Sequence, residues 1–278
     1  MRKFLAGVVQ LDSQGNKEDN LDQACGYIDE VAARGARLVA LPESMSLIGE
    51  SSSGDDGQES IPGYSTGILS QKAKEHGIFI HCGSLRERNP AGGRFYNTTV
   101  MLDDSGSIIA KYRKIHTFDA ILADGTVIKE SKNVHPGSEI VSVDTELGRF
   151  GFSICYDIRF PELFRLLALD GARILFTPAN FTLPTGKDHW ETILRTRAIE
   201  NGCYVVAPAQ IGKKPKFTAF GNSMIVDPWG TVIARTSDEP GIAIAEIDLD
   251  YQEKIRTQLP SLLNRREDVY TISSVSHI

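Results

Sequence analysis

Apolar and polar positions follow two different periods along the chain, and these periods alternate. Residues 4–11 form a short apolar run that is typical of a strand. Polar capping residues at 16–20 then precede apolar positions spaced three or four apart, which predicts a helix that Gly35 ends. A second apolar run at 37–41 completes a β-α-β unit. The chain therefore begins in the manner of a layered α/β protein.

The same alternation continues towards the C-terminus. We expect a helix around 68–73, a strand at 78–82, and a hairpin whose strands at 95–102 and 107–112 flank a polar turn. Strands at 140–143 and 150–155 and a helix from Pro161 follow. The second half repeats the scheme with strands at 172–177, 204–207 and 242–247, a helix at 188–200 and a hairpin at 223–234. This order predicts one α/β domain over residues 1–278, built from two similar halves that share a core.

Some segments lack a clear period. Residues 51–58 are rich in Ser, Gly and Asp, which predicts a flexible loop beside the strand ends. Residues 117–139 have an irregular pattern with turn signals. Residues 252–278 show no obvious core face, and we interpret them as a C-terminal arm that packs on a neighbouring subunit.

Composition and charge narrow the function classes. Apolar residues make up 41% and charged residues 24% of the chain, as in ordinary globular proteins. The net charge of −6 argues against a nucleic-acid partner. The 4–11 run is too short for a signal peptide, and no apolar stretch is long enough to span a membrane. The four cysteines lack the spacing of disulfide frameworks or zinc sites. We therefore expect a cytoplasmic protein with reduced thiols and no membrane partner.

Candidate chemistry gathers at three predicted strand ends. Cys155 ends one strand and begins a turn into a helix, Glu43 follows the strand at 37–41, and Lys114 follows the second hairpin strand. An α/β protein binds its ligands outside the carboxyl ends of its strands. Each residue alone has an ordinary explanation, as a core thiol, a turn carboxylate or a solvated cation. Their joint placement is what indicates a catalytic site.

The three residue types suit nucleophilic catalysis. A thiol with a reference pKa of about 8.5 is mostly protonated at neutral pH, so an attacking cysteine needs a base or a neighbouring cation. Glu43 is the candidate base, and the Lys114 charge and the local backbone dipole favour the thiolate. The tetrahedral intermediate carries an oxyanion, for which Lys114 and the backbone N–H of Tyr156 are the candidate donors.

These motifs resemble the nitrilase, or carbon-nitrogen hydrolase, superfamily over nearly the whole chain. Residues 41–43 (LPE), 112–116 (YRKIH) and 155–162 (CYDIRFPE) resemble its Glu, Lys and Cys motifs, in the family's order. The resemblance implies a four-layer α-β-β-α sandwich that pairs into homodimers or larger homo-oligomers. It also identifies Glu130 as the second active-site carboxylate, to which we assign the orientation of Lys114 and the substrate amide.

Within that superfamily the chain resembles the branch of Nit proteins that hydrolyse ω-amides, such as deaminated glutathione amidase and 2-oxoglutaramate amidase. Arg159, on the first helical turn after the nucleophile, is placed to pair with a substrate carboxylate, although a salt bridge to Glu162 is an equal alternative. Phe181 is a candidate wall for the acyl chain and Thr185 a hydrogen-bond donor to its far end, unless both only shape their loop. The resemblance implies release of ammonia from a primary amide through a Cys155 thioester.

Other functions stay open at this stage. A nitrilase acting on C≡N and an N-carbamoyl amidohydrolase need closely similar chemistry, and a non-catalytic scaffold could share the fold. We expect no cofactor and no metal, because the histidines at 76, 116 and 135 lack metal-ligand spacing. His81, Cys82 and Cys203 fit a core better than a site, and His189 and Trp190 are expected to fix a helix start rather than to touch substrate.

Overall fold

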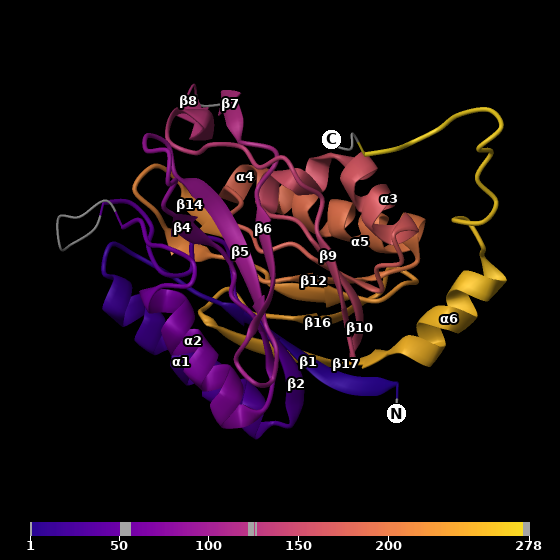
Figure 1. Ribbon diagram of the computed structural model, residues 1–278, viewed down its shortest axis with the longest axis horizontal. Coiled ribbons are helices and arrows are strands. Elements are labelled where there is room, and N and C mark those ends of the chain that lie inside the picture. The colour runs from indigo at the N-terminus through magenta and orange to yellow at the C-terminus, as the bar shows by residue number, and fades with distance from the viewer. Residues whose placement is uncertain (1, 51–56, 122–124, 126, 275–278) are drawn as a thin grey trace.

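One side of the core is formed by a sheet whose strands come mostly from the first half of the chain. The computed structural model describes all residues except 1, 51–56, 122–124, 126 and 275–278 (Figure 1). The strands of this sheet are β1 (Lys3–Gln10), β2 (Ala36–Ala40), β3 (Phe79–His81), β4 (Leu85–Glu87), β5 (Tyr96–Leu102), β6 (Ile108–Arg113) and β17 (Gly241–Asp248). Their order is β17-β1-β2-β3-β5-β4, with β6 paired to β5. β1, β2 and β3 are parallel, so their carboxyl ends meet at one edge.

The second sheet repeats this plan. It contains β9 (Ser142–Thr145), β10 (Gly148–Phe152), β11 (Ile174–Phe176), β12 (Tyr204–Ala207), β15 (Met224–Val226) and β16 (Val232–Arg235), in the order β16-β15-β12-β11-β10-β9. β10, β11 and β12 are parallel, and antiparallel strands flank them. The two predicted hairpins are present as β5–β6 and β15–β16.

Helices cover the outer face of each sheet. α1 (Lys17–Ala33) and α2 (Tyr64–His76) lie on the first sheet, and α3 (Pro161–Leu169) and α5 (Glu191–Asn201) lie on the second (Figure 1). α1 begins as predicted, because the Asn16 side chain accepts from two backbone N–H groups of its first turn, and it buries Leu21, Ala24, Ile28 and Val31. The α-β-β-α sandwich is confirmed.

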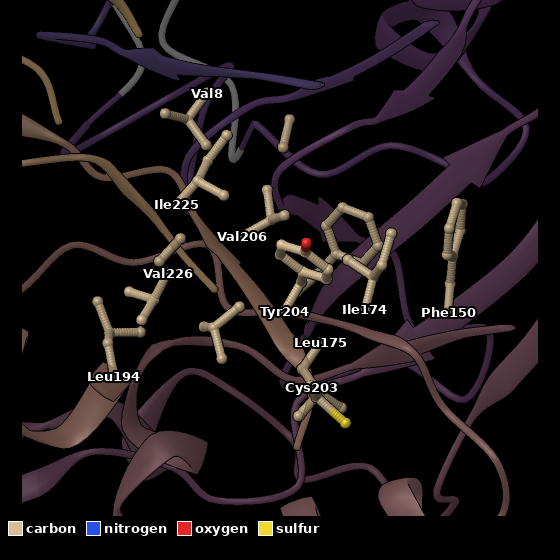
Figure 2. Close-up of a cluster of buried hydrophobic side chains, with 14 of the residues drawn as sticks. Val8, Phe150, Ile174, Leu175, Leu194, Cys203, Tyr204, Val206, Ile225 and Val226 are labelled. Atoms are coloured by element: carbon tan, nitrogen blue, oxygen red, sulfur yellow. The ribbon is translucent and has the colours of Figure 1, made fainter. Parts of the chain in front are cut away.

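The main core lies between the two sheets. Phe79 of the first sheet meets Phe150 of the second edge to face, at 6.2 Å between ring centres. Figure 2 shows part of this core, with Val8 from the first sheet and Phe150, Ile174 and Ile225 from the second. Because apolar side chains of both sheets share this layer, the two sheets are held in one relative position, which also fixes the strand ends of each sheet against the other.

Smaller elements lie around the strand ends. They are β7 (Asp119–Ile121), β8 (Val127–Lys129), the 3-10 helix η1 (Glu130–Lys132), the short helix α4 (Leu183–Thr185), the π-helical turn η3 (Gly186–Trp190), β13 (Ile211–Lys213) and β14 (Thr218–Phe220). Residues 117–139, expected to be irregular, thus contain the β7–β8 pair and η1. The helix expected from 188 begins as η3 and becomes regular only at Glu191. Most of the expected 51–58 loop lies outside the described residues.

The C-terminal segment differs from the expectation of an arm from 252. Residues 249–258 form α6 (Leu249–Gln258), which buries Gln252 and Ile255. The Gln252 amide donates to the backbone oxygens of Arg173 and Gly202. A polar side chain thus occupies a buried position, which is why the apolar pattern does not reveal the helix. The extended segment begins after α6 (Figure 1).

Candidate active site

Cys155 lies where the chain leaves β10. It is the first residue of the 3-10 helix η2 (Cys155–Arg159), which leads into α3 at Pro161. Its backbone N–H donates to the oxygen of Pro178 at 2.9 Å, and its φ of +49° is in the left-handed region, which non-glycine residues rarely adopt. The residue is only 7% exposed. The backbone therefore holds the sulfur in a fixed, mostly buried position at the edge of the second sheet.

Glu43, Lys114 and Glu130 come together beside this thiol. The Lys114 Nζ lies 3.0 Å from Oε1 of Glu43, and it lies 2.9 and 2.8 Å from the two carboxylate oxygens of Glu130. Glu43 lies close enough to the Cys155 thiol for its charge to raise the pKa of that thiol. Glu43 follows β2, Lys114 follows β6, and Glu130 begins η1, so three segments of the first half surround a thiol of the second. The structure thus brings together all four residues that the sequence indicated.

The charges of this cluster set the proton positions. Burial by itself would lower the pKa of Lys114, but the charges of Glu130 and Glu43 outweigh it and raise that pKa well above its usual value. Lys114 is therefore a permanent ammonium. Burial and then Glu43 raise the pKa of the Cys155 thiol well above its usual value, although Lys114 opposes them. Burial and Glu43 thus favour the protonated thiol in the free protein, in opposition to the Lys114 charge, and the candidate base Glu43 lies in the same cluster.

Two asparagines complete the site, and sequence reasoning did not single out either. The Asn97 amide donates to Glu43 Oε1 at 2.9 Å and to Glu130 Oε1 at 3.3 Å, so it spaces the two carboxylates. The backbone of Asn180 faces the Cys155 sulfur and lowers the pKa of that thiol, in opposition to burial. The side-chain oxygen of Asn180 is buried and has no hydrogen-bond partner among the described residues. The only sequence signal for either was its position at or near a strand end.

Cys155 lies in the wall of two cavities. The larger one, of about 290 Å³, is lined by both polar and apolar side chains; its wall contains Glu43, Lys114, Glu130 and Asn97, and also Lys216 and Phe217. The smaller one, of about 20 Å³, is lined by Phe118, Cys155, Tyr156, Arg159, Asn180, Phe181, Thr182 and Thr185. Cys155 thus lies between the larger cavity, which contains the candidate base Glu43, and the smaller cavity, which contains the predicted substrate-binding residues Arg159, Phe181 and Thr185.

Arg159 lies in the smaller cavity without a carboxylate partner. Its guanidinium carbon is 5.4 Å from the ring centre of Phe181 and 6.0 Å from that of Tyr156, and its Nη2 is 3.3 Å from Nδ1 of His189. Within the described part of the chain Arg159 makes no ion pair, so the alternative of a salt bridge to Glu162 is wrong. The Thr185 hydroxyl hydrogen-bonds to the Thr182 hydroxyl at 2.8 Å.

The remaining predicted positions are mostly structural. The Trp190 indole is fully buried, packs on Phe181 and donates to the oxygen of Asn222. His189 contacts Arg159, and so it lies nearer the site than expected. The backbone N–H of Tyr156 as an oxyanion donor stays a prediction.

A separate group on the first-sheet helices brings Asp29, Glu75 and His76 within the spacing of metal ligands. The Lys72 ammonium pairs with two of these residues, at 2.7 Å from Asp29 and 3.2 Å from Glu75. A cation of the chain itself thus neutralises this group.

Comparison with known proteins gives one consistent result. A family model described as carbon-nitrogen hydrolase matches residues 5–257. The chain is 40% identical over 270 residues to deaminated glutathione amidase of Synechocystis, covering 95% of this chain and 99% of that one. It is also 40% identical over 274 residues to omega-amidase NIT2-B of Xenopus laevis, covering 98% of each chain.

Solved structures agree with this result. The NitFhit protein of C. elegans matches with a TM-score of 0.89 and 37% identity, covering 97% of this chain and 66% of that one. A carbon-nitrogen hydrolase from Helicobacter pylori matches with a TM-score of 0.85 and 28% identity, covering 97% of each chain. Among the described residues, none of the helices combines the length and the apolar character needed to cross a bilayer.

Proposed function

The chain belongs to the carbon-nitrogen hydrolase family, and we propose that it hydrolyses an ω-amide of a small carboxylate-bearing substrate, with Cys155 as the nucleophile. It is a hydrolase of non-peptide C–N bonds, similar to deaminated glutathione amidase and omega-amidase. The observation that carries the proposal is the Cys155 thiol, which shares the wall of one cavity with Glu43 and the Lys114 ammonium.

The first half of the reaction forms a thioester. As the sulfur attacks the amide carbonyl carbon, Glu43 accepts the thiol proton, so the thiolate forms only in the transition state. The carbonyl electron pair moves to oxygen, where Lys114 and the Tyr156 N–H stabilise the negative charge. Glu43 then returns the proton to the amide nitrogen, the C–N bond breaks, and ammonia leaves.

The second half regenerates the thiol. Glu43 accepts a proton from water, the water oxygen attacks the thioester carbon, and the C–S bond breaks to give the acid as Glu43 returns the proton to the Cys155 sulfur. Glu43 thus acts as base and then acid in each half of the reaction, which requires it to stay close to both sulfur and leaving group. Glu130 contributes by binding the Lys114 ammonium with both oxygens, which holds this positive charge beside Cys155, where the oxyanion forms.

The two cavities divide the substrate. The leaving nitrogen must face Glu43, so it lies in the larger chamber, and the acyl chain extends towards Arg159 in the smaller cavity. A volume of about 20 Å³ holds roughly one water molecule, so the acyl chain enters only when the Arg159 side chain moves off the Phe181 ring. When the Arg159 guanidinium leaves the Phe181 ring and binds a substrate carboxylate, it gains the anionic partner that it lacks among the described residues of the substrate-free protein.

The size of the larger chamber favours a second candidate. Ammonia needs little of a space of about 290 Å³, so an N-substituted ω-amide with a larger leaving amine fits the same site. The chamber wall also carries Lys216, an exposed cation that makes no ion pair within the described residues, and which suits an anionic group on that amine.

A matched set of substrates tests the proposal. Purified protein is given 2-oxoglutaramate, its N-alkyl amide, deaminated glutathione, an N-carbamoyl acid and a nitrile of equal chain length, and release of ammonia or amine is measured. We expect turnover of the ω-amides and its loss in Cys155→Ala with the melting temperature retained. Equal inactivity on every ω-amide, with turnover of the nitrile or the N-carbamoyl acid, would replace the proposed reaction.

A further inference from the structure

We propose that Asp157 is a positioning residue that sets the location of Lys114 relative to Cys155; this inference rests on the proposed function of that site. Asp157 belongs to the turn after the nucleophile but does not point into either cavity at Cys155. Its side chain is fully buried. A buried carboxylate is retained at such a position only where hydrogen bonds replace its lost hydration.

Four donors surround this carboxylate. Oδ1 accepts from the backbone N–H of His116 at 3.0 Å and from its Nδ1 at 2.7 Å. Oδ2 accepts from the Tyr112 hydroxyl at 2.7 Å and from the backbone N–H of Ile154 at 2.8 Å. Each oxygen thus has two donors, so no acceptor position of the carboxylate is left open.

The donors come from both catalytic segments. Tyr112 and His116 lie two residues before and two residues after Lys114, so the carboxylate holds the chain on both sides of the catalytic cation. Ile154 is the residue before Cys155, and the backbone N–H of Asp157 donates back to the Ile154 oxygen at 3.1 Å. One side chain therefore connects the end of β6 in the first sheet to the nucleophile turn in the second.

The groups around Asp157 suit a fixed connection. Burial and the Asp157 charge raise the pKa of Tyr112 well above its usual value, so its hydroxyl stays a donor. The His116 ring is stacked on Phe160, with 3.6 Å between ring centres and 7° between planes, which orients Nδ1 towards the carboxylate. None of these side chains is needed as an acid or base in the proposed reaction.

The nucleophile turn needs such a connection. The φ of Cys155 is +49°, a conformation that costs free energy in a non-glycine residue and persists only where surrounding bonds determine it. The Ile154 bond to Asp157 and the Cys155 bond to Pro178 fix the two peptides that precede that torsion. Without Asp157, Lys114 stays bound to Glu43 and Glu130 while the sulfur moves away from it.

Two tyrosine variants provide the first test. Tyr112→Phe removes the bond to Asp157 and the bond that the same hydroxyl accepts from the Ile115 N–H at 3.3 Å. Tyr204→Phe is its matched control, because that hydroxyl also donates one bond and accepts one. Tyr204 is also buried, but its hydroxyl contacts only the backbone of Asp248, away from the site. Displacement of catalytic groups by about 1 Å can cost on the order of 100-fold in rate, so for one lost bond of four we expect kcat to fall about tenfold in Tyr112→Phe. The KM should change less than about threefold, and Tyr204→Phe should retain the wild-type kcat.

A readout without substrate separates this inference from the proposed function. The rate at which iodoacetamide alkylates Cys155 depends on the charges facing the sulfur, namely Lys114, Glu43 and, through Lys114, Glu130. We expect alkylation of Cys155, followed by peptide mass spectrometry, to slow about tenfold in Asp157→Asn and less in Tyr112→Phe. Asparagine keeps the size of the side chain, but its amide NH₂ group cannot accept hydrogen bonds, so the two donors that face one of the Asp157 oxygens lose their acceptor.

The outcomes are distinct. If both tyrosine variants lose similar thermal stability while kcat and alkylation stay at wild-type values, Asp157 is only structural and the inference is overturned. If Asp157→Asn does not fold, the kcat and alkylation rate of Tyr112→Phe, compared with those of Tyr204→Phe, test the inference. If the wild type hydrolyses no amide, the proposed function fails, and the alkylation rates still measure the effect of Asp157 on the Cys155 environment.

Discussion

Replacement of Arg159 by methionine tests substrate recognition most sharply. Methionine keeps an unbranched side chain that packs against Phe181, but it removes the guanidinium. Arg159 has no carboxylate partner among the described residues, so the substitution breaks no ion pair of the folded protein. We therefore expect the melting temperature to stay close to that of the wild type, which separates the effect on binding from an effect on stability.

The size of the effect follows from the contacts that a substrate carboxylate gains. Hydrogen bonds to charged groups contribute about 1.5–3 kcal/mol each. Arg159 is partly exposed and must first leave the Phe181 ring, so we expect a net loss of about 2–3 kcal/mol. This corresponds to a fall in kcat/KM of about 30- to 150-fold. Arg159→Lys keeps the charge but not the planar pair of donors, so its kcat/KM should lie between those of the wild type and Arg159→Met.

The assay compares each ω-amide with a neutral analogue that carries a methyl ester in place of the distal carboxylate. Arg159→Met should lose activity only on the charged substrate and should narrow the preference between the two. Arg34→Met, which removes an exposed cation at the end of α1, controls for net charge. Equal losses on both substrates, or none, would refute the assignment of Arg159 to the carboxylate.

Two further predictions concern Glu43 and Glu87. Because Glu43 raises the pKa of the Cys155 thiol, Glu43→Gln should lower that pKa and speed iodoacetamide labelling at neutral pH, while kcat falls by about 100-fold or more; slower labelling would contradict this. Burial alone would raise the pKa of Glu87, but bonds from Arg113, Thr98 and Lys111 lower it from 4.5 to about 2. Its folded pKa is therefore depressed, and Glu87 stabilises the fold by about 3 kcal/mol above pH 4.5, a contribution lost as the pH falls towards 2. In urea unfolding, Glu87→Gln should lose this amount at pH 7 and less at pH 3; a constant difference would be inconsistent with the shift.

The alternation of strands and helices could be predicted from the sequence because it depends on local periods, whereas the α-β-β-α order of the layers came from the family resemblance. Short apolar runs and helical spacing alternate along the chain, and parallel strands place their carboxyl ends at one edge. Glu43, Lys114 and Cys155 could thus be assigned to the same edge from their positions after strands. Glu130 lies in a segment without a clear period, and only family resemblance pointed to it.

Features that depend on tertiary packing were out of reach. Burial and the neighbouring Glu43 together raise the pKa of the Cys155 thiol, and no local sequence pattern encodes either burial or that contact. α6 was missed because Gln252 occupies a buried position in place of an apolar residue. The contacts of Asp157 could not be predicted from local pattern, since its partners Tyr112 and His116 are more than 40 positions away.

The central claim is that acyl transfer passes through Cys155. Wild-type protein and Cys155→Ala are mixed with a turned-over ω-amide, quenched in acid within the first turnovers, and analysed by intact-protein and peptide mass spectrometry. The account predicts an added mass equal to the acyl group, located on the peptide that contains Cys155, and neither adduct nor turnover in Cys155→Ala. Hydrolysis by Cys155→Ala at the wild-type rate would contradict it.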